Sequence, residues 1–194
     1  WAQPGEGAGN ANGLVIAADA QGNSVVAGTY NSTLDLGGPL LSTPDEEGLF
    51  LAKYDPAGVL LWSHITANGT GITVHGITID DAGGIALVGM YQGEVTFIPG
   101  EVGTTLTSAG SFDVFVAEYA EDGSPLWARS IGDTGYDYGA SIAHDGAGDV
   151  YVTGDLHQGA FNLSSSKVFV SKFANDGTPV WTTESADYGT QHLG

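Results

Sequence analysis

Hydrophobic and polar residues alternate along this chain in short stretches. At residues 50–54 the sequence Phe-Leu-Ala-Lys-Tyr has a period of two, which predicts a β-strand. Polar clusters rich in glycine and aspartate, such as residues 19–23, separate the stretches and are typical of tight turns. We therefore expect many short strands joined by tight turns.

The chain repeats one pattern three times, which is the strongest signal in the sequence. The first half of the repeat is a strand, an Asp-x-x-Gly turn and a second strand that ends on glycine. Each aspartate precedes its closing glycine by nine residues, and the turn glycine follows the aspartate by three. These positions are Asp19, Gly22 and Gly28 in copy one, Asp80, Gly83 and Gly89 in copy two, and Asp145, Gly148 and Gly154 in copy three.

The second half of the repeat begins with phenylalanine and ends with tryptophan twelve residues later. It reads Phe50, Lys53, Gly58 and Trp62 in copy one, Phe115, Glu118, Gly123 and Trp127 in copy two, and Phe169, Lys172, Gly177 and Trp181 in copy three. Glu118 takes the place of lysine in copy two. Because one position accepts either charge, we expect it to face solvent and not to form a site.

Each copy therefore holds two hairpins, and four antiparallel strands match one blade of a β-propeller. A β-sandwich is the alternative, but sandwiches rarely repeat themselves so regularly. We expect an all-β, propeller-type array of three four-stranded antiparallel blades that one chain alone does not close. The expected divisions are a linker at 1–13, blade 1 at 14–62, blade 2 at 77–127, blade 3 at 142–181, and a C-terminal linker at 182–194.

Large aromatic residues at equivalent strand positions are expected to pack in the core or between blades. They are Trp1, Trp62, Trp127, Trp181, Phe50, Phe115 and Phe169. Three blades also predict uncovered apolar faces on blades 1 and 3, and such faces usually mark an interface. Further blades of a longer chain, a six-blade ring of two chains, or a head-to-tail filament would each cover them.

Charge and composition exclude several partners. Four Lys and Arg against 23 Asp and Glu give a formal charge of −19, which disfavours nucleic acid as a partner. The chain has no cysteine, so thiolate chemistry and zinc–thiolate sites are excluded. The sequence contains no apolar window of about 18 residues, so no membrane insertion is expected.

Candidate chemistry is sparse. Asp80, Asp81, Asp145 and Asp149 could offer oxygen ligands to calcium, although aspartate at the start of a turn also caps its own backbone. No other cofactor is expected. His64, His75, His144, His157 and His192 occupy no equivalent repeat positions and form no metal motif. No nucleophile elbow occurs either, so we expect that the chain is not an enzyme.

Three Asn-x-Ser/Thr sequences fit the acceptor for N-glycosylation. They begin at Asn31, Asn68 and Asn162. Modification at these sites would place the chain outside the cell.

The strongest repeat segments, Asp145-Gly-Ala-Gly-Asp-Val-Tyr-Val-Thr-Gly154 and Phe50-Leu-Ala-Lys-Tyr-Asp-Pro-Ala-Gly58 with Trp62, resemble the SBBP β-propeller repeats of bacteria. The resemblance implies secreted or surface-anchored proteins. It implies no catalytic residues, because the shared positions are turns and core.

Two functions remain open. The first is an extracellular structural module whose blades stack within or between chains. The second is a lectin-like or adhesin-like module that binds a glycan with its variable loops at 30–49, 91–112 and 155–167. An enzyme on a propeller scaffold is a third reading, but no convergent polar residues support it.

Overall fold

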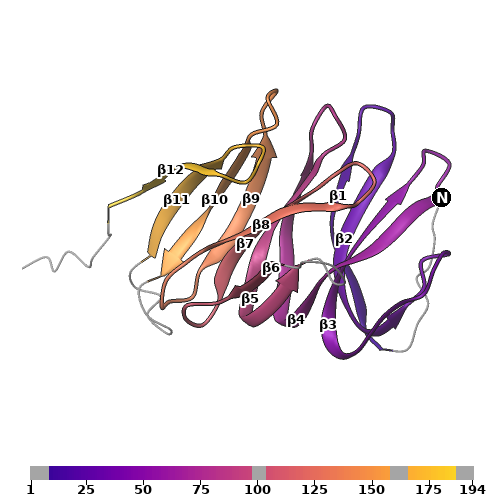
Figure 1. Ribbon diagram of the computed structural model, residues 1–194, viewed down its shortest axis with the longest axis horizontal. Helices are drawn as coiled ribbons and strands as arrows, with labels where there is room; N and C mark the ends of the chain where they lie inside the picture. The colour runs from indigo at the N-terminus through magenta and orange to yellow at the C-terminus, as the bar shows by residue number, and fades with distance from the viewer. Residues whose placement is uncertain (1–8, 98–103, 158–165, 187–194) are drawn as a thin grey trace, which may run out of the picture.

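The computed structural model describes residues 9–97, 104–157 and 166–186 (Figure 1), which form twelve strands. Within these ranges no helix has the length and apolar character needed to cross a membrane. The strands are β1 (Ala11–Ala18), β2 (Ser24–Leu34), β3 (Leu41–Tyr54), β4 (Leu60–Ile79), β5 (Ile85–Phe97), β6 (Thr104–Thr107), β7 (Asp113–Tyr119), β8 (Pro125–Ile131), β9 (Tyr138–His144), β10 (Val150–His157), β11 (Ser166–Phe173) and β12 (Pro179–Glu184).

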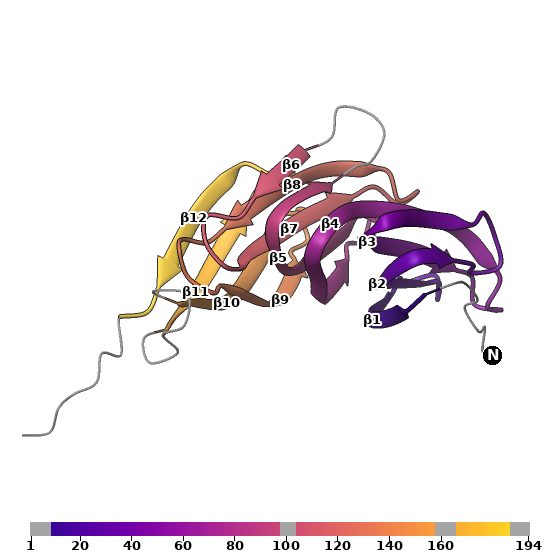
Figure 2. The same cartoon turned by 90° about the horizontal axis from the view of Figure 1, so that it is seen from below.

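The strands form two antiparallel sheets. The first has the order β1-β2-β3-β4-β5-β7-β8, with β6 paired to β5, and the second has the order β12-β11-β10-β9. Blade 1 consists of β1, β2, β3 and the first part of β4. Blade 2 consists of the second part of β4 with β5, β7 and β8, and blade 3 of β9 to β12. The expected all-β array of three four-stranded blades is confirmed, and Figure 2 shows that the described blades follow an open arc.

The connection between blades 1 and 2 is a strand. Residues 60–69 of β4 pair with β3, and residues 67–79 pair with β5. The register shifts where one partner is exchanged for the other, between Gly69 and Thr73. The fourth strand of blade 1 therefore runs directly into the first strand of blade 2. By contrast, β8 and β9 belong to different sheets.

Apolar layers lie between successive blades because alternate residues of each strand point to opposite faces. In β7, Phe115 and Ala117 belong to the cluster shared with blade 1, whereas Val114 and Val116 belong to the cluster shared with blade 3. The two-residue alternation predicted from the sequence thus supplies both interfaces of the middle blade.

Each closing glycine lies opposite the repeated phenylalanine on the neighbouring strand. The pairs in register are Gly28 with Phe50, Gly89 with Phe115, and Gly154 with Phe169. A Cβ at any of these glycines would come within about 2 Å of a backbone oxygen of the blade's first strand. The glycine is therefore required because two strands and an aromatic ring approach the same point.

The expectation of an uncovered outer face on blade 1 is wrong for most of that face. Phe50 and Tyr54 are buried there in a cluster with Tyr30, Leu34 and Leu41. The last two residues belong to the extensions of β2 and β3, which pair with each other beyond the Gly28 position. These extensions cover Phe50 and Tyr54 with side chains of the same blade. Leu14 and Ile16 of β1 remain exposed.

Candidate functional site

The hairpin turns share one backbone geometry, which fixes where their polar side chains point. In each turn the amide of the glycine donates to the carbonyl three residues earlier, as in Gly148 to Asp145 at 3.1 Å. The glycines have φ between 76° and 88°, a region that favours glycine over other residues. They are Gly22, Gly58, Gly83, Gly123, Gly148 and Gly177.

The aspartates that begin the first turn of each blade use one carboxylate oxygen to hold the turn. Asp80 Oδ1 accepts hydrogen bonds from the amides of Ala82 at 2.9 Å and Gly84 at 2.7 Å. Asp145 Oδ1 accepts from Ala147 at 2.8 Å and Asp149 at 3.1 Å. The second oxygen, Oδ2, is left for other partners, and these differ among the three blades.

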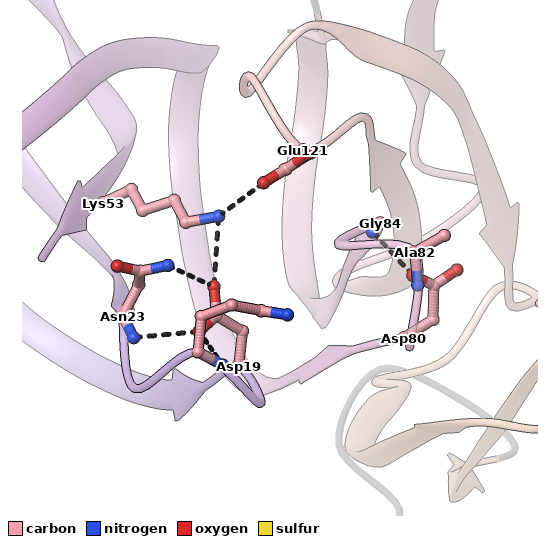
Figure 3. Close-up of polar contacts among 8 residues, drawn as sticks. Asp19, Asn23, Lys53, Asp80, Ala82, Gly84 and Glu121 are labelled. Carbon is pink, nitrogen blue, oxygen red and sulfur yellow. Dashed lines mark hydrogen bonds and ion pairs between the residues drawn. The ribbon is translucent and has the colours of Figure 1, made fainter.

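In blade 1 the second oxygen is held by a buried lysine. Asp19 Oδ2 lies 3.2 Å from Lys53 Nζ and accepts a hydrogen bond from the Asn23 amide at 2.8 Å (Figure 3). Lys53 also contacts Glu121 of blade 2 at 3.4 Å. Burial acts to raise the pKa of Asp19, but the hydrogen bonds from Asn23 and Lys53 and the ammonium charge outweigh it. The pKa of Asp19 is therefore below the usual value.

In blade 3 the equivalent lysine is paired twice. Lys172 Nζ lies 2.6 Å from Asp149 and 3.6 Å from Asp145, and Asp145 Oδ2 accepts the hydroxyl of Tyr151 at 3.1 Å. The backbone hydrogen bond from Ala147 is the main cause that lowers the pKa of Asp145. Two of the calcium candidates, Asp145 and Asp149, are thus paired with a lysine of their own blade.

In blade 2 the lysine is replaced by Glu118, and the expectation that this position faces solvent is wrong. Glu118 is only 3% exposed. The side chain leaves β7 toward the turn at Asp80, as the lysines of blades 1 and 3 do toward Asp19 and Asp145. The position accepts either charge because its buried partners differ, and not because it is exposed.

Glu118 and Asp80 meet a histidine from the next blade. Glu118 Oε1 lies 3.5 Å from Nε2 of His144, whose side chain is 3% exposed. Ligand atoms of Asp80, Glu118 and His144 all lie within 4.8 Å of one another. Glu118 Oε2 and both ring nitrogens of His144 are buried without a hydrogen-bond partner. These three residues could hold a metal ion with two oxygen ligands and one nitrogen.

A pocket of about 180 Å³ opens beside this group between the turns of blades 2 and 3. Asp80, Asp81, Asp145 and Asn175 are among the residues that line it. Three of the four calcium candidates therefore share one pocket, although they come from two turns. The fourth, Asp149, is bound to Lys172.

The repeated aromatic residues lie in different surroundings. Trp127 is buried between blades 2 and 3, and Trp62 packs partly buried between blades 1 and 2, whereas Trp181 is 43% exposed. Trp127 Nε1 donates to the carbonyl of Asn175 in blade 3 at 2.9 Å. The phenylalanines Phe50, Phe115 and Phe169 are all buried. Trp1 lies outside the described residues.

The glycosylation candidates are also placed unequally. Asn31 is exposed in β2, where its side-chain oxygen accepts a hydrogen bond from the Asn10 amide at 2.8 Å. Asn68 is partly buried in β4. Asn162 lies outside the described residues.

A second acidic group was missed by sequence reasoning. Asp113 and Asp137 are buried near the connection between blades 2 and 3, and Asp137 accepts amide hydrogen bonds from Asp133 at 2.8 Å and His157 at 2.9 Å. Burial raises the pKa of both carboxyls, and the nearby charge of Asp133 raises it further. Neither aspartate occupies a repeated position, so no pattern pointed to them.

Comparison with known proteins supports a propeller-type repeat. The profile of the SBBP β-propeller repeat matches residues 126–155, which run from β8 into β10, and this confirms the resemblance there. An uncharacterised WD repeat-containing protein of Acanthamoeba polyphaga mimivirus is 25% identical over 182 residues. The match covers 84% of this chain and 13% of the viral protein, so the chain spans a small part of that relative's length.

Proposed function

We propose that this chain is a non-catalytic structural module, secreted or at the cell surface, whose blades stack on further blades of the same repeat. Those blades belong either to a longer chain or to a second copy. The observation that carries the proposal is the outer face of blade 3, formed by β11 and β12. It exposes side chains that the other two blades bury at the same repeat positions.

The contrast is clearest in β11. Val168 and Val170 are 52% and 38% exposed. Their repeat equivalents in β7, Val114 and Val116, are fully buried against blade 3. Blade 3 therefore carries an apolar surface of the kind that packs between blades elsewhere in the chain. Among the described residues, no further blade covers this surface.

Trp181 repeats the contrast on β12. Its equivalent Trp127 is 6% exposed, because the turn at Gly177 of the next blade lies against the indole. Trp62 also lies against the equivalent glycine, Gly123, where His64 shares the contact. By this rule the indole of Trp181 is placed to receive the corresponding turn of another blade. The apolar face and the indole together therefore favour a blade of this repeat as the occupant.

The neighbouring Val180 provides a matched control. Val180 is exposed, but so are its equivalents Leu61 and Leu126 in the other blades. This position is exposed in every blade, so its exposure does not mark the uncovered end face of blade 3. A change at Val180 should therefore leave stacking intact, whereas a charge at Trp181 should prevent it.

The test is the mass of the purified chain in solution as a function of concentration, together with electron micrographs. We expect oligomers or fibres that grow with concentration, their loss in Trp181→Glu, and their retention in Val180→Glu. A monomer at every concentration would rule out a second copy as the source of the covering blade. Equal assembly by the two variants would overturn the proposal, because the β11–β12 face would then not be the contact.

A further inference from the structure

We propose that Asp80, Glu118 and His144 form a binding site for a divalent transition metal, with zinc as the best match, which links blade 2 to blade 3. The proposal is independent of stacking by the end blade. It begins from one difference among the repeats, namely that blade 2 places a carboxylate where blades 1 and 3 place an ammonium group.

The three blades differ in the charge that lies at this position. Lys53 pairs with Asp19 in blade 1, and Lys172 pairs with Asp145 and Asp149 in blade 3. In blade 2 the same geometry brings Glu118 toward Asp80. The buried Glu118 carboxylate and the partly buried Asp80 carboxylate repel each other when both are ionised, and a positive charge between them would remove that repulsion.

The side chains around this point lack the partners that burial normally demands. Both ring nitrogens of His144 and Oε2 of Glu118 are buried with no hydrogen-bond partner, although both side chains are more than nine-tenths buried. Such groups are nearly always satisfied by protein, water or an ion. One ligand atom from each of Asp80, Glu118 and His144 lies within 4.8 Å of the other two.

The separation of the ligand atoms favours a metal over a direct ion pair. A charge-assisted hydrogen bond between histidine and glutamate would bring the atoms to about 2.7–2.9 Å. Two ligands that bind one tetrahedral zinc at about 2.0–2.1 Å lie roughly 3.3–3.4 Å apart. Glu118 Oε1 and His144 Nε2 are 3.5 Å apart. A carboxylate oxygen of Asp80 lies within 4.8 Å of both.

In the turn of blade 2, the Oδ2 atom of Asp80 has no side chain of the turn bound to it. In blade 1 the Asn23 amide occupies Oδ2 of the aspartate. In blade 2 the equivalent residue is Gly84, which has no side chain to take that place. Asp80 Oδ1 holds the turn through the amides of Ala82 and Gly84, as Figure 3 shows, so Oδ2 is available to an ion.

The ligand set identifies the class of metal. One imidazole and two carboxylates suit zinc and its transition-metal neighbours. Calcium prefers six to eight oxygen ligands, which this group does not offer. Three protein ligands would leave a tetrahedral zinc one position for water, and Asp80 also lines a pocket between the turns of blades 2 and 3. Because Asp80 and Glu118 come from blade 2 and His144 from blade 3, the ion would join the two sheets.

The experiment uses the full chain after removal of metals with a chelator. We expect calorimetric titration with ZnCl₂ to give one site per chain. We also expect the melting temperature to rise by roughly 5–10 °C when free zinc is about a hundred times Kd. Calcium chloride should give a much smaller shift. Absence of zinc binding would overturn the proposal and leave a metal-free contact between Glu118 and His144.

Variants separate this site from adventitious binding. Glu118→Lys restores the pattern of the other blades, so we expect a folded chain that has lost its response to zinc. Glu118→Gln serves the same purpose if the lysine variant does not fold, and His144→Gln should also lose the response. His157→Gln removes another histidine with a buried, unpartnered Nδ1 and should retain it. An undiminished zinc response in the Glu118 and His144 variants would place the ion elsewhere and overturn the proposal.

Discussion

The indole of Trp127 lies directly against the backbone of Gly177 in the next blade. A Cβ at Gly177 would be 2.6 Å from Cγ and Cδ2 of the indole. Next to this contact, Trp127 Nε1 donates to the Asn175 carbonyl at 2.9 Å, and Arg129 Nε donates to the Gly177 carbonyl at 2.9 Å. The last strand of one blade therefore packs against the second hairpin turn of the following blade and donates hydrogen bonds to it.

This contact predicts that Gly177→Ala is destabilising. The new methyl group would clash with the indole, and alanine would be held at φ 76°, so we expect a loss of about 2 kcal/mol or more in the free energy of unfolding. Urea denaturation measures the loss. The control is Gly37→Ala, where alanine would be held at φ 91° but a Cβ meets nothing within 4 Å. A similar loss in both variants would mean that the Trp127 contact does not matter.

The buried pair of blade 1 predicts a large effect of removing its lysine. Lys53→Met leaves the buried Asp19 carboxylate without its ammonium partner, which should lower the free energy of unfolding by about 3–5 kcal/mol. Lys167→Met removes a lysine whose pair with Glu184 is partly exposed, and should lower it by about 1 kcal/mol or less. Chemical denaturation at neutral pH compares the two. Equal losses would contradict the assignment of Lys53 to the core.

Asp113 and Asp137 predict that mild acid stabilises the chain. Their pKa values are raised by burial in the folded state, so the folded chain binds protons before the unfolded chain as pH falls. The free energy of unfolding should therefore rise as pH drops through the raised pKa values toward the ordinary value near 3.8.

The stabilisation by acid should end below that value. The pKa values of Asp19 and Asp145 are lowered in the folded chain, so their ionised forms stabilise the fold. Below pH 3.8 these carboxylates become protonated, and the free energy of unfolding should fall. Asp113→Asn should flatten the rise between neutral pH and pH 3.8. Thermal melts across this range test it, and an unchanged profile in the variant would show that Asp113 does not contribute.

The local structure of this chain follows from its sequence. Alternation at residues 50–54 predicts a strand, and the spacing of Asp145, Gly148 and Gly154 predicts a hairpin. Both follow because the contacts that decide them lie within a few residues of each other, either across a turn or along one strand. The repeat then predicts the blade, because three copies of a four-stranded unit are compatible with few other folds.

Only the tertiary structure decided what surrounds Glu118. Its partner His144 belongs to another blade, and the other copies have no histidine at that position, so a pattern that compares one copy with the next could not bring the two together. The same holds for Val168 and Val114, which look alike in sequence and differ in exposure because a neighbouring blade covers only one of them. Burial and charge pairing depend on what packs across an interface, and that information is absent from any single repeat.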